Sequence, residues 1–125
     1  MDSYALLAYL KKEEKYKKVK DLLGSKDLVL LMNEINLGEC FYILARVRGM
    51  EKAEYFLHTV LPNLPIKKRA NTFQDVIEAA KIKAHHSLSY ADSFAIQTSL
   101  KENAPIVTGD PEFKKVAKLV KIEWL

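Results

Sequence analysis

The feature that most constrains the fold is an alternation of helical patterns with short, continuous apolar runs. Leu28–Met32 and Pro105–Thr108 are runs of this kind, and Ile66–Arg69 and Lys121–Leu125 are two further candidate strands. A continuous apolar run of this length is typical of a strand covered on both faces, as in a parallel sheet. Helices that alternate with such strands predict an α/β fold with one parallel sheet flanked by helices. We expect a single domain, residues 1–125.

The helices between these strands are predicted from apolar spacing and from residues that begin and end helices. Asn33 is placed to cap a long helix, and Gly24 and Gly49 are placed to end helices. Asp110 and Pro111 are predicted to begin a short helix. The longer expected helices are Tyr4–Lys12, Glu13–Leu23, Glu34–Arg48, Glu51–Leu61, Thr72–His85 and Ser89–Glu102.

The composition of the chain says more about its cellular location than about its chemical function. Because Cys40 is the only cysteine, an intrachain disulfide and a cysteine-based zinc cluster are excluded, and we expect a cytoplasmic protein. No apolar run approaches the ~20 residues that a membrane span needs, so we expect no membrane partner. The net charge of +4 permits contact with a polyanion without requiring it.

Several acidic residues fall where an α/β fold builds its sites, at strand ends and helix starts. Each has a simpler explanation, which stays open. Asp2 could cap the first helix, Asp92 follows Ser89 at capping-box spacing, and Asp110 precedes a proline that opens a helix. The candidate site residues are Asp2, Glu39, Asp92 and Asp110.

Glu39 is harder to explain as a cap, because its helix is apolar nearly all round. A helix of that kind is expected to be buried on most sides, where a carboxylate needs a partner or a metal ion. Arg46 and Arg48 leave a solvated stripe as the alternative. If the four carboxylates converge, their repulsion raises pKa values unless a cation is present, and oxygen ligands favour Mg²⁺ or Mn²⁺.

Four segments in order make this sequence similar to a known family. They are Asp2–Leu7, Asn36–Glu39, Ser89–Ala95 and Val107–Phe113. Together they resemble the PIN-domain family over essentially the whole chain, and the nearest branch is that of the VapC-type toxins. The resemblance implies a Mg²⁺- or Mn²⁺-dependent endoribonuclease, commonly a homodimer, that a small antitoxin protein holds inactive.

By this resemblance Asp2, Glu39 and Asp92 are the core metal-binding acids and Asp110 is the fourth. It further implies that the polar side chains of Ser3, Asn36 and Thr108 support these acids. For contact with the RNA substrate we expect Arg46, Lys67, Lys68 and Arg69, although such side chains are more often solvated surface. The other function left open is a catalytically incomplete PIN-like module that binds RNA or protein.

The beginning of the chain departs from the family pattern. The family's first Asp ends an apolar central strand, whereas Met1 directly precedes Asp2 here. We therefore expect that strand to be missing or truncated, with the natural protein beginning a few residues earlier. We also expect part of the early aromatic surface to contact a partner; its residues are Tyr4, Leu7, Tyr9, Leu10 and Tyr16.

Overall fold

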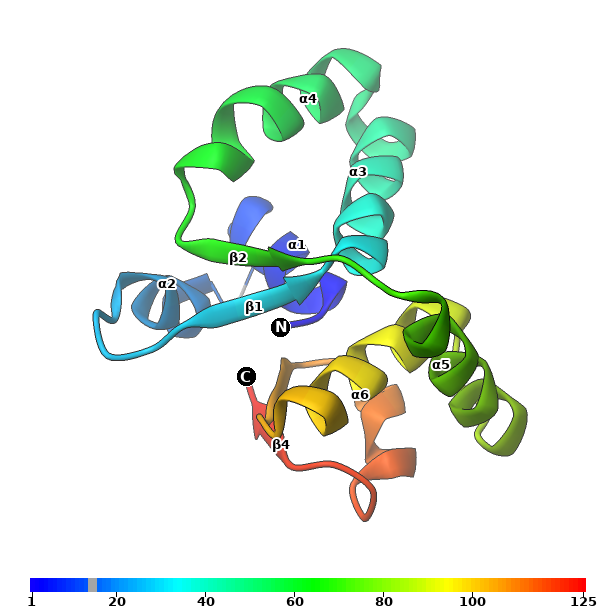
Figure 1. Ribbon diagram of the computed structural model, residues 1–125. Helices are drawn as coiled ribbons and strands as arrows, with labels where there is room; N and C mark the ends of the chain where they lie inside the picture. Colours follow the sequence, from blue (N-terminus) through cyan, green and yellow to red (C-terminus); the bar gives the residue numbers. More distant parts are fainter. Residues whose placement is uncertain (14–15) are drawn as a thin grey trace.

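The computed structural model describes residues 1–13 and 16–125. The helices are α1 (Ser3–Leu10), α2 (Tyr16–Gly24), α3 (Glu34–Arg48), α4 (Met50–Tyr55), α5 (Phe73–His85) and α6 (Tyr90–Glu102) (Figure 1). The strands are β1 (Leu30–Asn33), β2 (Ile66–Arg69), β3 (Ile106–Thr108) and β4 (Ile122–Trp124). Shorter turns of helix are η1 (Phe56–Val60), η2 (Leu61–Asn63) and η3 (Pro111–Val116). Part of the predicted helix Glu13–Leu23 lies outside the described residues.

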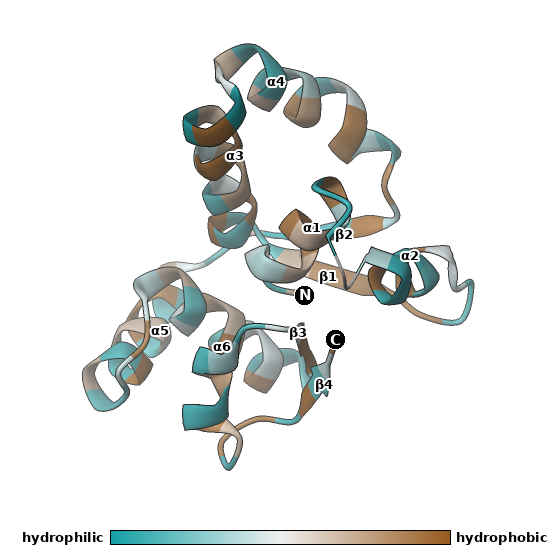
Figure 2. Ribbon diagram, turned by 180° about the vertical axis from the view of Figure 1, so that it is seen from behind, coloured by the Kyte–Doolittle hydropathy of each residue, from teal (hydrophilic) through white to brown (hydrophobic). Residues whose placement is uncertain are grey.

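The strands confirm the parallel α/β class but do not form the single sheet that was predicted. β1 pairs with β2, beginning with Leu30 opposite Ile66, and β3 pairs with β4. Both pairs are parallel, so their carboxyl ends, at Asn33 and Thr108, are the places where a site is expected. The two chain ends lie near each other in both views (Figures 1 and 2).

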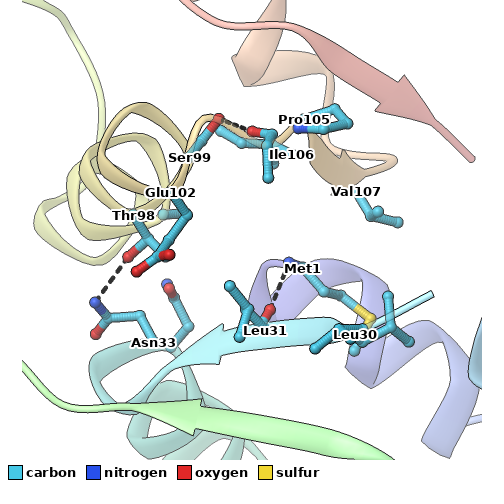
Figure 3. Close-up of a pocket in the computed structure, with 14 residues that line it drawn as sticks. Met1, Leu30, Leu31, Asn33, Thr98, Ser99, Glu102, Pro105, Ile106 and Val107 are labelled. Carbon is cyan, nitrogen blue, oxygen red and sulfur yellow. Dashed lines mark hydrogen bonds between the residues drawn. The ribbon is translucent and has the colours of Figure 1, made fainter.

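Met1 and Asp2 connect the two strand pairs. The Met1 amino group donates to the Leu31 carbonyl at 2.9 Å, and the Asp2 amide donates to the Val107 carbonyl at 3.2 Å. These two backbone bonds connect β1 to β3, and Leu30 of β1 and Val107 of β3 also belong to one buried cluster. A cavity of about 70 Å³ lies beside Met1 between the two strands, as Figure 3 shows.

Two predicted elements differ in extent from the observed ones. Leu28 and Val29 are 51% and 76% exposed, and the strand begins only at Leu30, where β2 supplies a partner. The expected helix Glu51–Leu61 is regular only to Tyr55 and then continues through η1 and η2. Pro62 lies in η2, and because proline has no amide hydrogen it cannot extend a regular helix.

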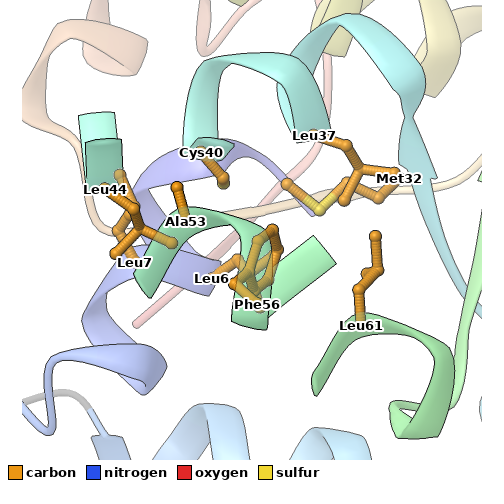
Figure 4. Packing of buried hydrophobic residues seen from close by; sticks show 9 residues of the cluster. All are labelled: Leu6, Leu7, Met32, Leu37, Cys40, Leu44, Ala53, Phe56 and Leu61. Carbon is orange, nitrogen blue, oxygen red and sulfur yellow. The ribbon is translucent and has the colours of Figure 1, made fainter. Parts of the chain in front are cut away.

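α3 is less buried than its apolar sequence predicts. Ile35 is 41% exposed and Val47 is 64% exposed, so the expectation of burial on most sides is wrong. These side chains are exposed because α3 packs one side against α1 and α4 in the core (Figure 4). The main core cluster consists of Leu6, Leu7, Met32, Leu37, Cys40, Leu44, Ala53, Phe56 and Leu61.

Hydropathy follows this arrangement. In Figure 2 the ribbon of β1 is largely in the colour of hydrophobic residues, whereas much of the ribbon of α2 is in the colour of hydrophilic residues. A second cluster packs α6 against the C-terminal segment through Ile96, Phe113 and Val116. Among the helices described, none combines the length and the apolar character that crossing a membrane requires.

Candidate metal site

Asp2 is held at the start of α1 by two bonds to its carboxylate. Oδ1 accepts from the Ala5 amide at 3.0 Å, and Oδ2 accepts from the Thr108 hydroxyl at 2.6 Å. The first bond is the helix cap that the sequence offered as a simple explanation, and the second joins Asp2 to the carboxyl end of β3. Asp2 is only 1% exposed, so its carboxylate lies inside the protein.

Glu39 is brought to the same region by α1. The Ser3 hydroxyl donates to Glu39 Oε1, and the Cys40 thiol lies 3.7 Å from the Ser3 carbonyl oxygen. These contacts fix the first turn of α1 against the middle of α3. Burial, and the charges of Glu39 and Asp2, raise the pKa of the Cys40 thiol, so Cys40 remains a neutral core residue.

Asp92 belongs to the first turn of α6, where the Ser89 side chain accepts from its amide at 3.1 Å. Asn36 of α3 fastens this turn, because its Nδ2 donates to the Ala91 carbonyl at 3.0 Å. Asn36 is fully buried, and its Oδ1 has no hydrogen-bond partner among the described residues. The resemblance placed Asn36 beside Glu39; the structure uses it to join the helix of Glu39 to the turn of Asp92.

Asp110 is connected to Asp2 through a shared hydroxyl. Thr108 Oγ1, which donates to Asp2, also accepts from the Asp110 amide at 3.0 Å. The Asp110 carboxylate in turn accepts from the Glu112 amide at 3.0 Å, which is the predicted cap of a short helix. Cap and candidate ligand are therefore compatible roles for this residue.

The electrostatics of these acids differ from those of solvated carboxylates. Burial, the largest cause, raises the pKa of Asp2 to about 7, and nearby Asp92 contributes in the same direction. Burial also raises the pKa of Asp92 to about 6, helped by the charges of Asp110 and Glu39. Asp92 therefore interacts electrostatically with each of the other three acids.

This donor set fits a hard divalent cation in its chemistry. It offers carboxylate oxygens, one unpartnered amide oxygen on Asn36, and negative charges that repel one another. The side chains are not gathered as ligands, however, because no group of three or more His, Cys, Asp or Glu residues in the described ranges is arranged to hold a metal ion. Asp2 and Glu39 are instead engaged by Thr108 and Ser3.

The basic residues expected to contact RNA are divided by the structure. Arg46 on α3 and Lys67 and Lys68 on β2 are exposed. Arg69 is not available in the same way, because its guanidinium bonds Glu102 at 2.8 Å and lies 3.6 Å from Asp75. Its side chain is only 12% exposed. Arg69 therefore has a structural partner that the basic run Lys67–Arg69 did not reveal.

The sequence of this chain matches the model of one protein family. A model described as the PIN domain matches residues 1–119. The chain belongs to the PIN-domain family. No curated protein sequence matches it. This PIN domain begins its family match at Met1, one residue before the buried Asp2.

Solved structures share the fold of this PIN domain at low sequence identity. VapC20 of Mycobacterium tuberculosis, titled a Sarcin-Ricin loop cleaving toxin, has 16% identity and a TM-score of 0.75, covering 95% of this chain and 93% of that one. VapBC2 of Rickettsia felis, bound to a promoter DNA fragment, has 18% identity and a TM-score of 0.75, covering 99% and 96%. A toxin–antitoxin complex from Klebsiella pneumoniae has 11% identity and a TM-score of 0.66, covering 94% and 89%.

Sequence reasoning missed one buried carboxylate in this PIN domain. Asp75 of α5 is 2% exposed and bonds Lys101 at 2.7 Å and Gln97 at 2.9 Å. Its reciprocal capping bonds with Thr72 were readable as a Thr-x-x-Asp pattern at the start of a helix. The contacts with Lys101 and Arg69 join distant segments, which no local pattern indicates.

Proposed function

We propose that this PIN domain is a divalent-metal-dependent endoribonuclease and the toxin of a toxin–antitoxin pair. The observation that carries the proposal is the connection of the four acids. Asp2 and Asp110 share the Thr108 hydroxyl, Ser3 joins Glu39 to the first turn of α1, and Asn36 joins α3 to the turn of Asp92. These hydrogen bonds tie together the segments that carry the acids, and the charges of Glu39 and Asp110 act against that of Asp92, which a divalent cation would relieve.

In the proposed site Asp2, Glu39, Asp92 and Asp110 hold Mg²⁺ or Mn²⁺. When bound, such an ion supplies Lewis-acid polarisation of phosphate and a water of lowered pKa. The chain's own residues do the rest. Thr108, Ser3 and Asn36 fix the orientation of the acids, and Arg46, Lys67 and Lys68 provide positive charge for the RNA backbone.

The proposed reaction is hydrolysis of an RNA phosphodiester. Water adds to phosphorus, the bond from phosphorus to the 3′-oxygen breaks, and the leaving oxygen takes up a proton. The products then carry a 5′-phosphate and a 3′-hydroxyl. Since the attacking oxygen is that of water, the 2′-hydroxyl of the RNA takes no part in the bond changes.

The toxin assignment is supported by the relatives rather than by the site. VapC20 is titled a Sarcin-Ricin loop cleaving toxin, and other structures of the same fold are titled toxin–antitoxin or VapBC complexes. We extend to this chain an RNA substrate, a small antitoxin protein as partner, a homodimer and a cytoplasmic location.

The test is cleavage of a labelled RNA over a titration of Mg²⁺ and Mn²⁺, with EDTA as the zero point. We expect cleavage only with metal, 5′-phosphate ends, and loss of cleavage in Asp92→Asn. The matched control is Asp21→Asn, which removes an exposed carboxylate of α2 and should leave cleavage unchanged. Metal-independent cleavage, or an Asp92→Asn variant as active as the wild type, would refute the proposal. A folded protein that binds RNA without cutting it would instead support the catalytically incomplete module.

A further inference from the structure

Tyr4 is an exposed aromatic residue directly beside the candidate site. It follows Asp2 and Ser3, which are 1% and 7% exposed, yet its own side chain is 38% exposed. Within the described residues its hydroxyl has no hydrogen-bond partner. Tyr9 of the same helix differs, because it stacks on Tyr16 with ring centroids 5.4 Å apart. The Tyr9 ring is therefore covered by another aromatic ring, whereas part of the Tyr4 ring is exposed to solvent.

Gly109 fixes where the Tyr4 ring lies. A Cβ added at Gly109 would stand only 2.7 Å from Tyr4 Cε1 and 3.4 Å from Tyr4 Cδ1. The ring thus rests on the backbone between Thr108 and Asp110, the segment whose hydroxyl connects Asp2 with Asp110. Because Gly109 has no side chain, the ring can approach this segment closely while its other parts remain exposed.

Resting on the proposed function, we propose that Tyr4 is a stacking platform for an unpaired RNA base next to the cleaved phosphodiester. Unpaired bases stack on aromatic side chains, whereas a base inside a duplex is already stacked on its neighbours. Tyr4 directly follows Ser3, whose hydroxyl contacts Glu39. A base stacked on Tyr4 would therefore set the position of its phosphate relative to Glu39. Tyr4 acts as a positioning residue.

The surroundings of Tyr4 favour a nucleotide over an apolar protein helix. The polar residues Asp2 and Ser3 precede Tyr4, and its ring lies against the backbone at Gly109, where an added Cβ would also lie 3.4 Å from Leu125 Cβ. An apolar helix docks through several hydrophobic anchors at helical spacing. A base needs only one ring face, with charge for its phosphate nearby.

The test compares four variants by thermal melting, by cleavage and by binding. Tyr4→Leu removes the ring, Tyr4→Phe keeps it, and Gly109→Ala displaces it with the added Cβ. Tyr55→Leu is the matched control, since Tyr55 is 61% exposed on α4. Cleavage kcat/KM is measured in Mg²⁺ on an unstructured RNA and on the same strand annealed to its complement. Binding is measured in EDTA by fluorescence of RNA containing 2-aminopurine, which reports stacking without cleavage.

We expect Tyr4→Leu to lower kcat/KM on the unstructured RNA by on the order of 10-fold. Gly109→Ala should act in the same direction, Tyr4→Phe should recover nearly full activity, and Tyr55→Leu should match the wild type. Fluorescence quenching by the wild type should disappear in Tyr4→Leu. If Tyr4→Leu fails to fold, the contrast between Tyr4→Phe and Gly109→Ala decides.

Failure of this inference differs from failure of the proposed function. Metal-dependent cleavage that is equal in wild type, Tyr4→Leu and Gly109→Ala overturns the inference alone. Tyr4-dependent quenching without any cleavage overturns the nuclease alone. A wild type that prefers the duplex, or that shows no quenching, overturns the platform.

Discussion

Asp2 and Asp75 are buried to the same degree and behave in opposite ways. They are 1% and 2% exposed, and each accepts a backbone amide at a helix start, at 3.0 Å from Ala5 and 2.9 Å from Thr72. Burial raises the pKa of Asp2 to about 7. The hydrogen bond from Lys101, then the Thr72 amide and the Arg69 charge, lower the pKa of Asp75.

The difference is the source of positive charge. Asp75 has Lys101 at 2.7 Å and Arg69 at 3.6 Å, so the protein itself neutralises it. The described residues include no lysine or arginine paired with Asp2. Its nearby positive charge is the buried amino group of Met1, which lowers the Asp2 pKa less than burial raises it. A buried carboxylate whose charge the fold compensates only in part is a candidate for a cation supplied from outside.

The largest expected effect separates the two residues by activity. Asp2→Asn should reduce metal-dependent RNA cleavage by more than ~100-fold, because even residues that only orient metal ligands change activity by up to about that factor. Asp75→Asn should stay within about twofold of the wild type, provided the assay runs well below its melting temperature. Initial cleavage rates at saturating Mg²⁺ provide the measurement. Equal losses in both variants would show that the two aspartates share a structural role.

The next largest effect is on the free energy of unfolding, where Asp75→Asn should have the larger effect and Asp2→Asn the smaller. Asp75→Asn should destabilise the protein by about 3 kcal/mol, because removing one partner of a buried pair leaves the other uncompensated. Breaking a buried pair costs about 3–5 kcal/mol, and we take the lower value because the Lys101 side chain is 50% exposed. Asp2→Asn should be neutral or slightly stabilising in metal-free buffer at pH 8, because it removes a poorly compensated charge. Denaturant unfolding in EDTA tests both.

A third effect is the pH dependence of stability in EDTA. Asp2 and Asp92 have raised pKa values, so between about pH 4 and pH 7 the folded state holds more protons than the unfolded state. Stability therefore falls as pH rises through that window. Asp75 has a lowered pKa, so its contribution is present above about pH 4 and is lost as pH falls below it.

These opposite slopes predict a stability maximum near pH 4–5 in EDTA. Asp2→Asn should flatten the decline above the maximum, and Asp75→Asn should flatten the decline below it. Added Mg²⁺ should raise stability at pH 8 and leave it unchanged at pH 4, where the acids are protonated. A wild-type profile that rises steadily from pH 4 to pH 8 in EDTA would be inconsistent with buried, unpaired acids.

The same comparison explains what the sequence could predict. Asp2 was identifiable because its segment resembles a family pattern, and the α/β class followed from apolar runs such as Pro105–Thr108, whose core became β3. Asp75 was not identifiable as a buried charge. Its cap with Thr72 is local, but the contact with Lys101 depends on how α5 packs on α6. Pattern reasoning finds local bonds and family motifs; it does not find ion pairs between distant segments.

The division of the strands into two pairs was unpredictable for a similar reason. Each strand was recognisable by its own residues, yet pairing depends on what lies between strands. β1 and β3 are bridged by Met1, which bonds Leu31, and by Asp2, which bonds Val107. No local pattern in the sequence indicates these bonds, because they join residues far apart along the chain.

The smallest expected effect concerns the two threonines beside the aspartates. Thr108 donates to Asp2 at 2.6 Å and accepts from the Asp110 amide, whereas the Thr72 hydroxyl accepts from the Asp75 amide at 3.1 Å. Thr108→Val and Thr72→Ala should each cost about 1 kcal/mol of stability, through a lost buried hydrogen bond and a lost cap respectively. Their effects on cleavage should differ, because only Thr108 orients proposed metal ligands.

Thr108→Val should therefore reduce cleavage by about 10- to 100-fold, the range for residues that orient metal ligands, whereas Thr72→Ala should leave it unchanged. The Thr108 bond also opposes the effect of burial on Asp2, so its loss should raise the Asp2 pKa further. The pH at which cleavage reaches half its maximum should then move upward in Thr108→Val and stay in place in Thr72→Ala. Thr108→Ser, which keeps the hydroxyl, should restore both rate and pH profile. If Thr108→Val and Thr72→Ala instead lower cleavage in proportion to their lost stability, with an unmoved pH profile, Thr108 is a packing residue and Asp2 needs no orientation by β3.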